Sequence, residues 1–271
     1  MKPKAIILLA ILCPLSAPSI GAQEVNIDQY LKNESELKTR LWQYEKQHAY
    51  DDILLDQTDY DSKYWELHYD VRNISGQILT GKVFLTNQSN IDNLTSIDYN
   101  LKGAMTVDTV EMDGGHVAFS RPTNILRIIL DRAYNTGELF TTTIYYHGHP
   151  YPTGFGSFTY TTHNGVPIVY SFSCPYGARD WWPCKDIQHD KADSADVYIT
   201  CDTSYTGVSN GVLQEIQENE DSTHTFHWHE SYPITSYLIC MAVTNYRSFT
   251  DWYVGLNGDS LPVTNYAYPE N

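Results

Sequence analysis

The chain has 271 residues, of which 33 are Asp or Glu and 17 are Lys or Arg, so its formal net charge at pH 7 is −16. A protein that binds nucleic acid needs clustered Lys and Arg to neutralise phosphates, so this composition argues against DNA or RNA as a partner. The 22 tyrosines favour β-strands, in which large aromatic side chains pack well.

The N-terminus has the pattern of a secretory signal peptide. Two lysines precede the apolar run 5–15, and small residues follow up to Ala22. This pattern predicts that residues 1–22 are removed after Ala22 and that the protein is secreted or periplasmic. The apolar run is too short to span a bilayer, and no later segment reaches the required length, so we expect no membrane span.

A leader segment, residues 23–59, follows the signal peptide. Within it, Leu37, Leu41 and Tyr44 recur at helical spacing, which predicts a short helix over residues 35–47. From Tyr64 the pattern changes to a period of two, as expected for a strand with one wet face. The strand-like runs are 64–71, 78–86, 94–101, 105–112, 125–130, 139–147, 166–172, 196–201, 212–216, 223–229, 237–246 and 261–268.

Asn-Gly and Asp-Gly turn signals separate several of these runs, at 113–115, 164–165, 210–211 and 257–258. The fold class is therefore all-β, with a mostly antiparallel sheet or sandwich domain over residues 60–271 and a short N-terminal leader helix.

Three patterns could suggest chemistry, and each has a simpler interpretation. The pairs His227-Trp-His229 and His147-Gly-His149 place two imidazoles on one face of a strand, a spacing that a metal could use. We interpret them as solvent-facing histidines and assign no metal ligand. The acidic stretch 190–196 (DKADSAD) lacks the alternating ligands and central Gly of a calcium loop, so a solvated loop is the better interpretation.

We identify no complete catalytic site in the sequence, which contains no His-Glu-x-x-His. Four cysteines follow Ala22, and in an exported chain they allow two disulfides with three connectivities. A Cys174–Cys184 bridge would tie one loop, whereas Cys201 and Cys240 lie in apolar runs and suit buried thiols.

The densest motif is residues 177–186, GARDWWPCKD. Arg179 and Asp180 are candidates for a partly buried ion pair, and the two tryptophans after them are expected to pack on either side of a strand or turn. One interpretation is a packing cluster at the base of a loop. The other is that the cluster holds the preceding loop, residues 172–176, rigidly against a ligand.

This motif resembles the signature (Gly/Asp)-Ala-Arg-x-x-(Phe/Trp)-Pro-Cys-x-Asp in the N-terminal domain of zinc aminopeptidases of the aminopeptidase N family. The stretch 232–238 (YPITSYL), the turn 209–211 (SNG) and the strand YWELHYDV are similar to other parts of that domain, and the resemblance covers roughly residues 60–270. The residues taken as the structural motif are Arg179, Asp180, Trp182, Pro183, Cys184 and Asp186.

The resemblance implies a saddle-shaped β domain that precedes a thermolysin-like catalytic domain. In the family, that second domain carries the zinc ligands, the general base and a Gly-x-Met-Glu-Asn loop, and none of these occurs in this chain. The resemblance therefore implies no cofactor and no catalytic residue in this chain, and zinc in the full-length enzyme. We predict that the isolated chain binds no stoichiometric zinc and hydrolyses no aminoacyl amide.

In full-length relatives, a Glu or Gln five residues before the motif's Arg helps to hold the free amino group of the substrate. The resemblance thus implies a substrate-binding segment at Cys174, Pro175 and Tyr176, but a thiol stands where the acceptor is expected. Either amine recognition is altered, or Cys174 pairs with Cys184 and another residue takes over.

Two functions follow as expectations. The first is the N-terminal domain of a secreted zinc metalloaminopeptidase, which shapes the active-site entrance and helps to recognise the peptide N-terminus; its partners are that peptide and the missing catalytic domain. The second is a free-standing secreted β-rich module that binds a peptide, glycan or protein without catalysis.

Overall fold

The computed structural model describes residues 57–271, which form seventeen strands and two short 3-10 helices, η1 (Ala178–Asp180) and η2 (Ser236–Leu238). This confirms the all-β fold class. The predicted signal peptide and leader helix lie outside the described residues. Within residues 57–271, neither helix is long and apolar enough to cross a membrane.

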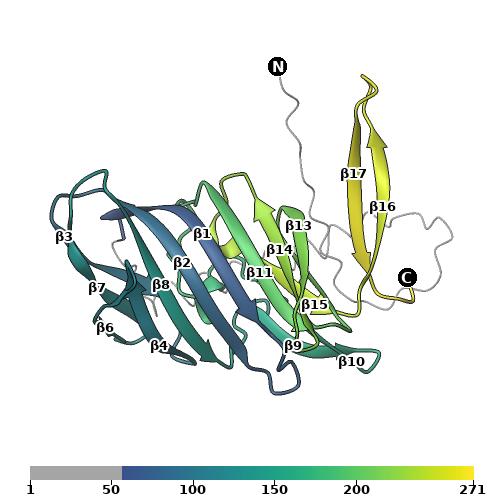
Figure 1. The fold of residues 1–271 in the computed structure, drawn as a ribbon, viewed down its shortest axis with the longest axis horizontal. Coiled ribbons are helices and arrows are strands. Elements are labelled where there is room, and N and C mark those ends of the chain that lie inside the picture. The colour runs from purple at the N-terminus through teal and green to yellow at the C-terminus, as the bar shows by residue number, and fades with distance from the viewer. Residues whose placement is uncertain (1–56) are drawn as a thin grey trace, which may run out of the picture. The chain divides into compact units, whose positions relative to one another are not determined.

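The largest sheet has eight strands in the order β13-β14-β11-β1-β2-β8-β4-β5 (Figure 1). Neighbouring strands in it are antiparallel, except that β1 and β11 are parallel. Its strands are β1 (Tyr60–Asp70), β2 (Leu79–Ser89), β4 (Met105–Met112), β5 (Gly115–His116), β8 (Leu139–Gly148), β11 (Ser194–Asp202), β13 (Val212–Glu218) and β14 (Thr223–Glu230).

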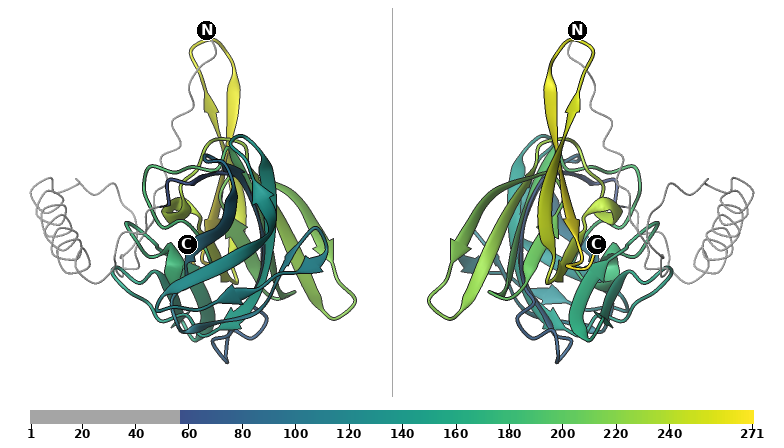
Figure 2. Two further views of the ribbon diagram at one scale, coloured as in Figure 1. Left: turned by 90° about the vertical axis from the view of Figure 1, so that its left-hand side faces the viewer. Right: turned by 90° about the vertical axis from the view of Figure 1, so that its right-hand side faces the viewer.

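Three smaller antiparallel sheets complete the described part of the chain, in the orders β12-β15-β10-β9, β3-β7-β6 and β16-β17. Their strands are β3 (Leu94–Asn100), β6 (Phe119–Ser120), β7 (Ile125–Tyr134), β9 (Phe158–His163), β10 (Val166–Ser171), β12 (Thr206–Ser209), β15 (Met241–Thr244), β16 (Arg247–Val254) and β17 (Ser260–Ala267). Figure 2 shows the β16–β17 hairpin extending away from the other sheets.

Successive side chains along each strand point to opposite faces of the sheet, and this alternation decides which of them are buried. In β1, Trp65, Leu67 and Tyr69 are at most 3% exposed, while Glu66 and His68 between them face the outer side of the sheet. The same period holds in β2, β8 and β11, so the eight-stranded sheet has one dry face against the core and one wet face.

Most predicted strands are confirmed, but the run 237–246 is not one strand. Residues Ser236–Leu238 form η2, and β15 begins only at Met241. The Asn210 side chain explains the break, because its amide donates to the Leu238 carbonyl and its oxygen accepts from the Cys240 amide. These bonds satisfy backbone groups that a strand ladder would otherwise use.

Candidate functional site

The motif 177–186 lies in the loop between β10 and β11, and every residue of it is buried. Its two tryptophans are fully buried. The Trp181 ring lies 4.9 Å from that of Tyr69 and 5.1 Å from that of Phe158, and the Trp182 ring lies 5.2 Å from that of Trp65. The prediction that the tryptophans pack into the core is confirmed, and they anchor this loop beneath β1.

The charged residues of the motif pair differently from the prediction. Arg179 Nε donates to Asp186 Oδ2 at 2.6 Å, so the expected Arg179–Asp180 ion pair is wrong. Asp180 instead accepts hydrogen bonds from the hydroxyls of Thr153 and Ser157. Burial raises the pKa of the Asp180 carboxyl above its usual value, and these two hydrogen bonds offset only part of that rise. Burial likewise raises the pKa of Asp186, although Arg179 opposes it.

The loop before the motif, residues 172–176, is fixed at both ends. The Phe172 amide donates to the Ser157 carbonyl at 3.0 Å, and the Gly177 amide donates to the Ser173 carbonyl at 2.7 Å. Trp181 Nε1 donates to Ser173 Oγ at 2.9 Å. Gly177 is required here, because a Cβ would lie 2.6 Å from the Ser157 Cβ. The motif therefore holds the loop through its backbone and through one indole.

Within this loop, Cys174 and Tyr176 are partly exposed, whereas Pro175 between them is buried and follows a cis peptide bond. The two outer side chains of the predicted substrate-binding segment are thus accessible on a loop with a fixed backbone. A Cys174–Cys184 bridge is not formed, because Cys184 is a free thiol. Burial raises the pKa of the Cys184 thiol well above its usual value, so it is no nucleophile.

The other two cysteines are also free thiols. Burial raises the pKa of Cys201 to about 12 and that of Cys240 to about 11. Cys201 is fully buried in β11, as predicted, whereas Cys240 is only partly buried and lies between η2 and β15.

A second buried ion pair was not predicted. Lys185 Nζ lies 2.9 Å from Asp190 Oδ2, donates to the Tyr60 carbonyl at 2.6 Å and sits 4.4 Å from the centre of the Tyr60 ring. Ser62 Oγ also donates to Asp190. The acidic stretch 190–196 is therefore not a solvated loop at its first residue, because Asp190 is buried against the Lys185 ammonium.

These contacts set the charge of Asp190. Burial raises the pKa of its carboxyl, but the Lys185 charge and the hydrogen bonds to Lys185 and Ser62 outweigh burial and hold the pKa below the usual range. Sequence reasoning did not pair Lys185 with Asp190, although they are neighbours in the same loop. Their other contacts, with Tyr60 and Ser62, join residues more than a hundred positions apart.

The histidine pairs lie on the wet side of their strands. His227 Nε2 and His229 Nδ1 both contact Asp196 Oδ1, at 2.6 and 3.0 Å, while His147 contacts Asp108 and His149 contacts the Gln77 carbonyl. Among residues 57–271, no three His, Cys, Asp or Glu side chains are placed to hold a metal ion. The described residues thus do not fit a zinc site.

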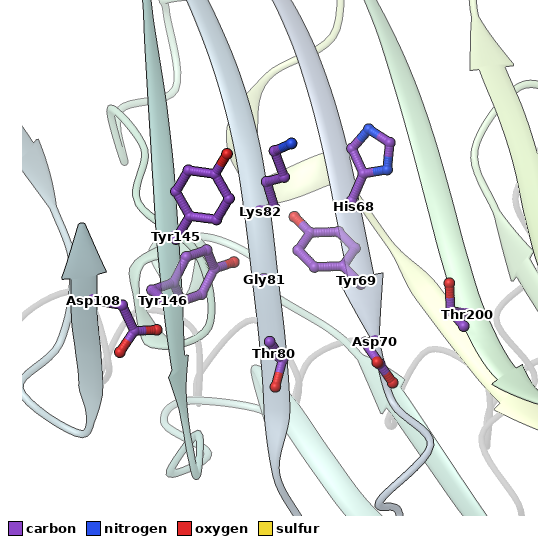
Figure 3. Close-up of a pocket in the computed structure, with 10 residues that line it drawn as sticks. All are labelled: His68, Tyr69, Asp70, Thr80, Gly81, Lys82, Asp108, Tyr145, Tyr146 and Thr200. Carbon is purple, nitrogen blue, oxygen red and sulfur yellow. The ribbon is translucent and has the colours of Figure 1, made fainter. Parts of the chain in front are cut away.

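A shallow depression of about 210 Å³ lies on the outer side of the eight-stranded sheet (Figure 3). Lys82 stands there between the rings of Phe84 and Tyr145, at 4.7 and 5.1 Å. The Tyr69 and Tyr146 side chains belong to the buried side of the same strands. The cluster around the motif is on that buried side, so this depression is separate from the candidate site.

The family described as the Peptidase M1 N-terminal domain matches residues 57–238, which include the whole motif. No curated protein sequence matches the chain.

Solved structures of M1 zinc metallopeptidases share the fold. One, a point mutant from Deinococcus radiodurans bound to a Tyr-Ser-Ala substrate, has a TM-score of 0.69 and 22% identity over 78% of this chain and 48% of its own. The enzyme from that organism without the mutation gives 0.68 and 23% over 76% and 47%. A two-domain M1 zinc metallopeptidase mutant bound to L-tryptophan gives 0.68 and 23% over 77% and 48%.

At this identity the structures establish the fold alone, and the chain spans about half the length of each of them. The family match covers most of the chain and contains the buried motif that fixes the loop after β10. The chain therefore belongs to the Peptidase M1 N-terminal domain family.

Proposed function

We propose that this chain is the N-terminal domain of an exported zinc metalloaminopeptidase. In that enzyme it forms one wall of the active-site entrance and contacts the N-terminus of the bound peptide, while a catalytic domain supplies zinc and the general base. Membership of the M1 N-terminal family supports this proposal, as does the similarity of its fold to metallopeptidases, one of them holding a tripeptide substrate.

The observation that carries the proposal is the tethered loop 172–176. A wall that selects a ligand must keep its geometry when the ligand arrives. Here the Trp181 indole, itself fully buried, bonds the side chain of Ser173, the residue just before Cys174. The partly exposed side chains of Cys174 and Tyr176 are thereby presented from a rigid base.

Cys174 sets what this wall can recognise. A carboxylate or amide oxygen accepts strong hydrogen bonds from an ammonium group, whereas a thiol is a weak acceptor. We therefore expect this domain to bind a free peptide amino group less tightly than a domain with Glu or Gln at that position. Neighbouring contacts must then contribute more to binding.

The test uses the product of the complete gene and an aminopeptidase assay. Trp181→Phe keeps an aromatic ring in the core but removes the bond to Ser173. We expect its KM for an aminoacyl amide to rise about three- to tenfold with kcat nearly unchanged, the range that follows from losing a hydrogen bond of about 1 kcal/mol.

Trp182→Phe is the matched control, because the Trp182 indole nitrogen has no hydrogen-bond partner among the described residues. It removes a similar volume, and we expect less than a twofold change in KM. Equal effects of the two substitutions would show that KM depends on packing in the core and not on the hydrogen bond from Trp181 to Ser173. A product without zinc-dependent aminopeptidase activity would contradict the proposed function and favour the binding module.

A further inference from the structure

The depression on the outer side of the eight-stranded sheet has a lining that the proposed function does not use. Its volume of about 210 Å³ suits one small ring and is below that of a site for a drug-sized ligand. The side chains around it come from strands β1, β2, β4 and β8, and they include His68, Asp70, Thr80, Lys82, Asp108 and Tyr145 (Figure 3). The lining therefore mixes charges of both signs, a hydroxyl and aromatic rings.

Lys82 is held in this lining by aromatic rings and not by a carboxylate. Its ammonium lies 4.7 Å from the centre of the Phe84 ring and 5.1 Å from that of Tyr145. Within residues 57–271 it forms no ion pair, although the chain has 33 acidic against 17 basic residues. Contacts with ring faces hold an ammonium in position and leave its N–H groups able to donate. Lys82 therefore offers hydrogen-bond donors to a ligand.

A β-bulge brings a carboxylate to the same depression. The pairing of β4 with β8 shifts between Val107 and Thr109, so Asp108 has no partner in β8. A bulge of this kind turns a side chain toward a site that regular pleating would not let it reach. The Asp108 carboxylate contacts His147 Nδ1 at 2.9 Å and is otherwise exposed. Asp108 therefore supplies acceptors where Lys82 supplies donors.

The third side of the lining continues into a row of stacked rings. The His68 ring lies parallel to that of Tyr198, with centres 4.2 Å apart, and the Tyr198 ring stacks on His227 at the same distance. His68 Nε2 also contacts Glu66 Oε1 at 2.7 Å. The three rings are half-buried and lead away from the depression across β1, β11 and β14. They fix His68 before a ligand arrives, which lowers the entropic cost of binding.

The charges of the lining decide which ligand it suits. An anion would be attracted by Lys82 and repelled by Asp70 and Asp108, and a cation would meet the reverse. A neutral ring that carries hydroxyls avoids both repulsions, because each hydroxyl donates and accepts. Its C–H faces can pack against the Tyr145 ring. A small zwitterion also balances the charges, but it leaves the ring faces unused.

We propose that this depression binds one pyranose unit of a glycan. Lys82 donates to its hydroxyls, Asp108 accepts from them, and Tyr145 packs against the sugar ring. The row formed by His68, Tyr198 and His227 is the surface along which the glycan continues. The inference is independent of the proposed function, because the loop 172–176 and its motif belong to the other side of the sheet.

The test titrates the complete gene product with methyl pyranosides of glucose, galactose, mannose and N-acetylglucosamine, and with a linear trisaccharide of each, by saturation-transfer NMR and calorimetry. We expect at least one methyl pyranoside to bind with a Kd of about 1–10 mM, in keeping with its few atoms. Its trisaccharide should bind at least about tenfold more tightly, because it also reaches the row of rings.

Lys82→Met keeps the apolar stem and removes the donors, so it should weaken binding at least about tenfold. Lys63→Met is the matched control, because Lys63 is in the same sheet, pairs with Asp61 and lies outside the depression. It should change Kd less than about twofold. Urea midpoints of both variants check that the fold is kept.

The inference is overturned if no sugar of the panel binds below about 50 mM, if Lys82→Met binds as the wild type does, or if glycine displaces the sugar at an equal concentration, which indicates a zwitterion site. A trisaccharide that binds no more tightly than its methyl pyranoside overturns the assignment of the row. Aminopeptidase activity is a separate readout, so the failure of either proposal is recognised without the other.

Discussion

The ion pair formed by Lys185 and Asp190 is buried, with side chains that are 4 and 6% exposed. Asp190→Asn removes the anion and leaves the Lys185 ammonium in the core without a counter-charge. Breaking a buried pair in this way costs about 3–5 kcal/mol of unfolding free energy. Urea denaturation at pH 7 measures this loss. Asp193→Asn is the control, since Asp193 is exposed in the same stretch and should change stability by less than about 0.5 kcal/mol.

The Asp190 carboxyl also makes the stability of the protein depend on pH. The folded-state pKa of Asp190 lies below its usual value, so the stability it contributes is complete above about pH 4 and is lost as the pH falls through the lower folded-state pKa. Asp180 and Asp186 have the opposite effect on stability. Their pKa values are raised in the folded protein, so the folded state binds protons at a higher pH than the unfolded state and is stabilised as the pH falls. The wild type should therefore lose more stability than Asp190→Asn between pH 5 and 2; equal losses would contradict this.

For single residues, burial could be predicted from the sequence more readily than the partners of charged side chains. The burial of the two tryptophans follows from their size and from the apolar strands around them. Arg179 lies in η1 and pairs with Asp186, seven positions later, whereas adjacency in the sequence had favoured Asp180. The contact of Lys185 with the Tyr60 carbonyl was not predictable, since Tyr60 lies in β1, 125 positions away, whereas Asp190 is close in sequence but was interpreted as solvated.

Among the strands, β2 contains a position where a glycine is required. Gly81 lies opposite Tyr146, and a Cβ there would lie 2.3 Å from the Tyr146 ring in a fully packed core. Gly81→Ala should cost about 1–3 kcal/mol, the usual penalty of overpacking. Gly103→Ala is its control, because nothing lies within 4 Å of the added Cβ. Urea midpoints that fall by the same amount in both would contradict the assignment.

Period-two alternation found most strands because one side of each is dry. It missed β16, whose apolar residues Phe249, Trp252 and Tyr253 lie on both faces and so show no alternation. The division into four sheets and the parallel pairing of β1 with β11 were not predictable either. The parallel pairing joins Tyr64 to Ser194, and the four-stranded sheet joins Val169 to Val243, so both depend on contacts between distant segments.

The charge of the chain and its exposed hairpin act against each other. A net charge of −16 at pH 7 keeps copies apart by repulsion, while the apolar faces of β16 and β17 favour association. Salt shortens the range of the repulsion and leaves the apolar attraction in place. The balance between these two forces decides how the chain behaves alone.

Self-association of the isolated chain should therefore be greatest near its isoelectric point of about 4.8, where the repulsion vanishes. Light scattering between pH 4 and 8 should peak there and fall severalfold on replacing Trp252 and Leu261 with Thr, because these side chains expose apolar area on opposite faces of the hairpin. Replacing Ile129 and Leu139, which are similarly exposed on other strands, is the control and should change the scattering little. An equal fall in both double variants would mean that association follows total apolar exposure and that the hairpin is not a special surface.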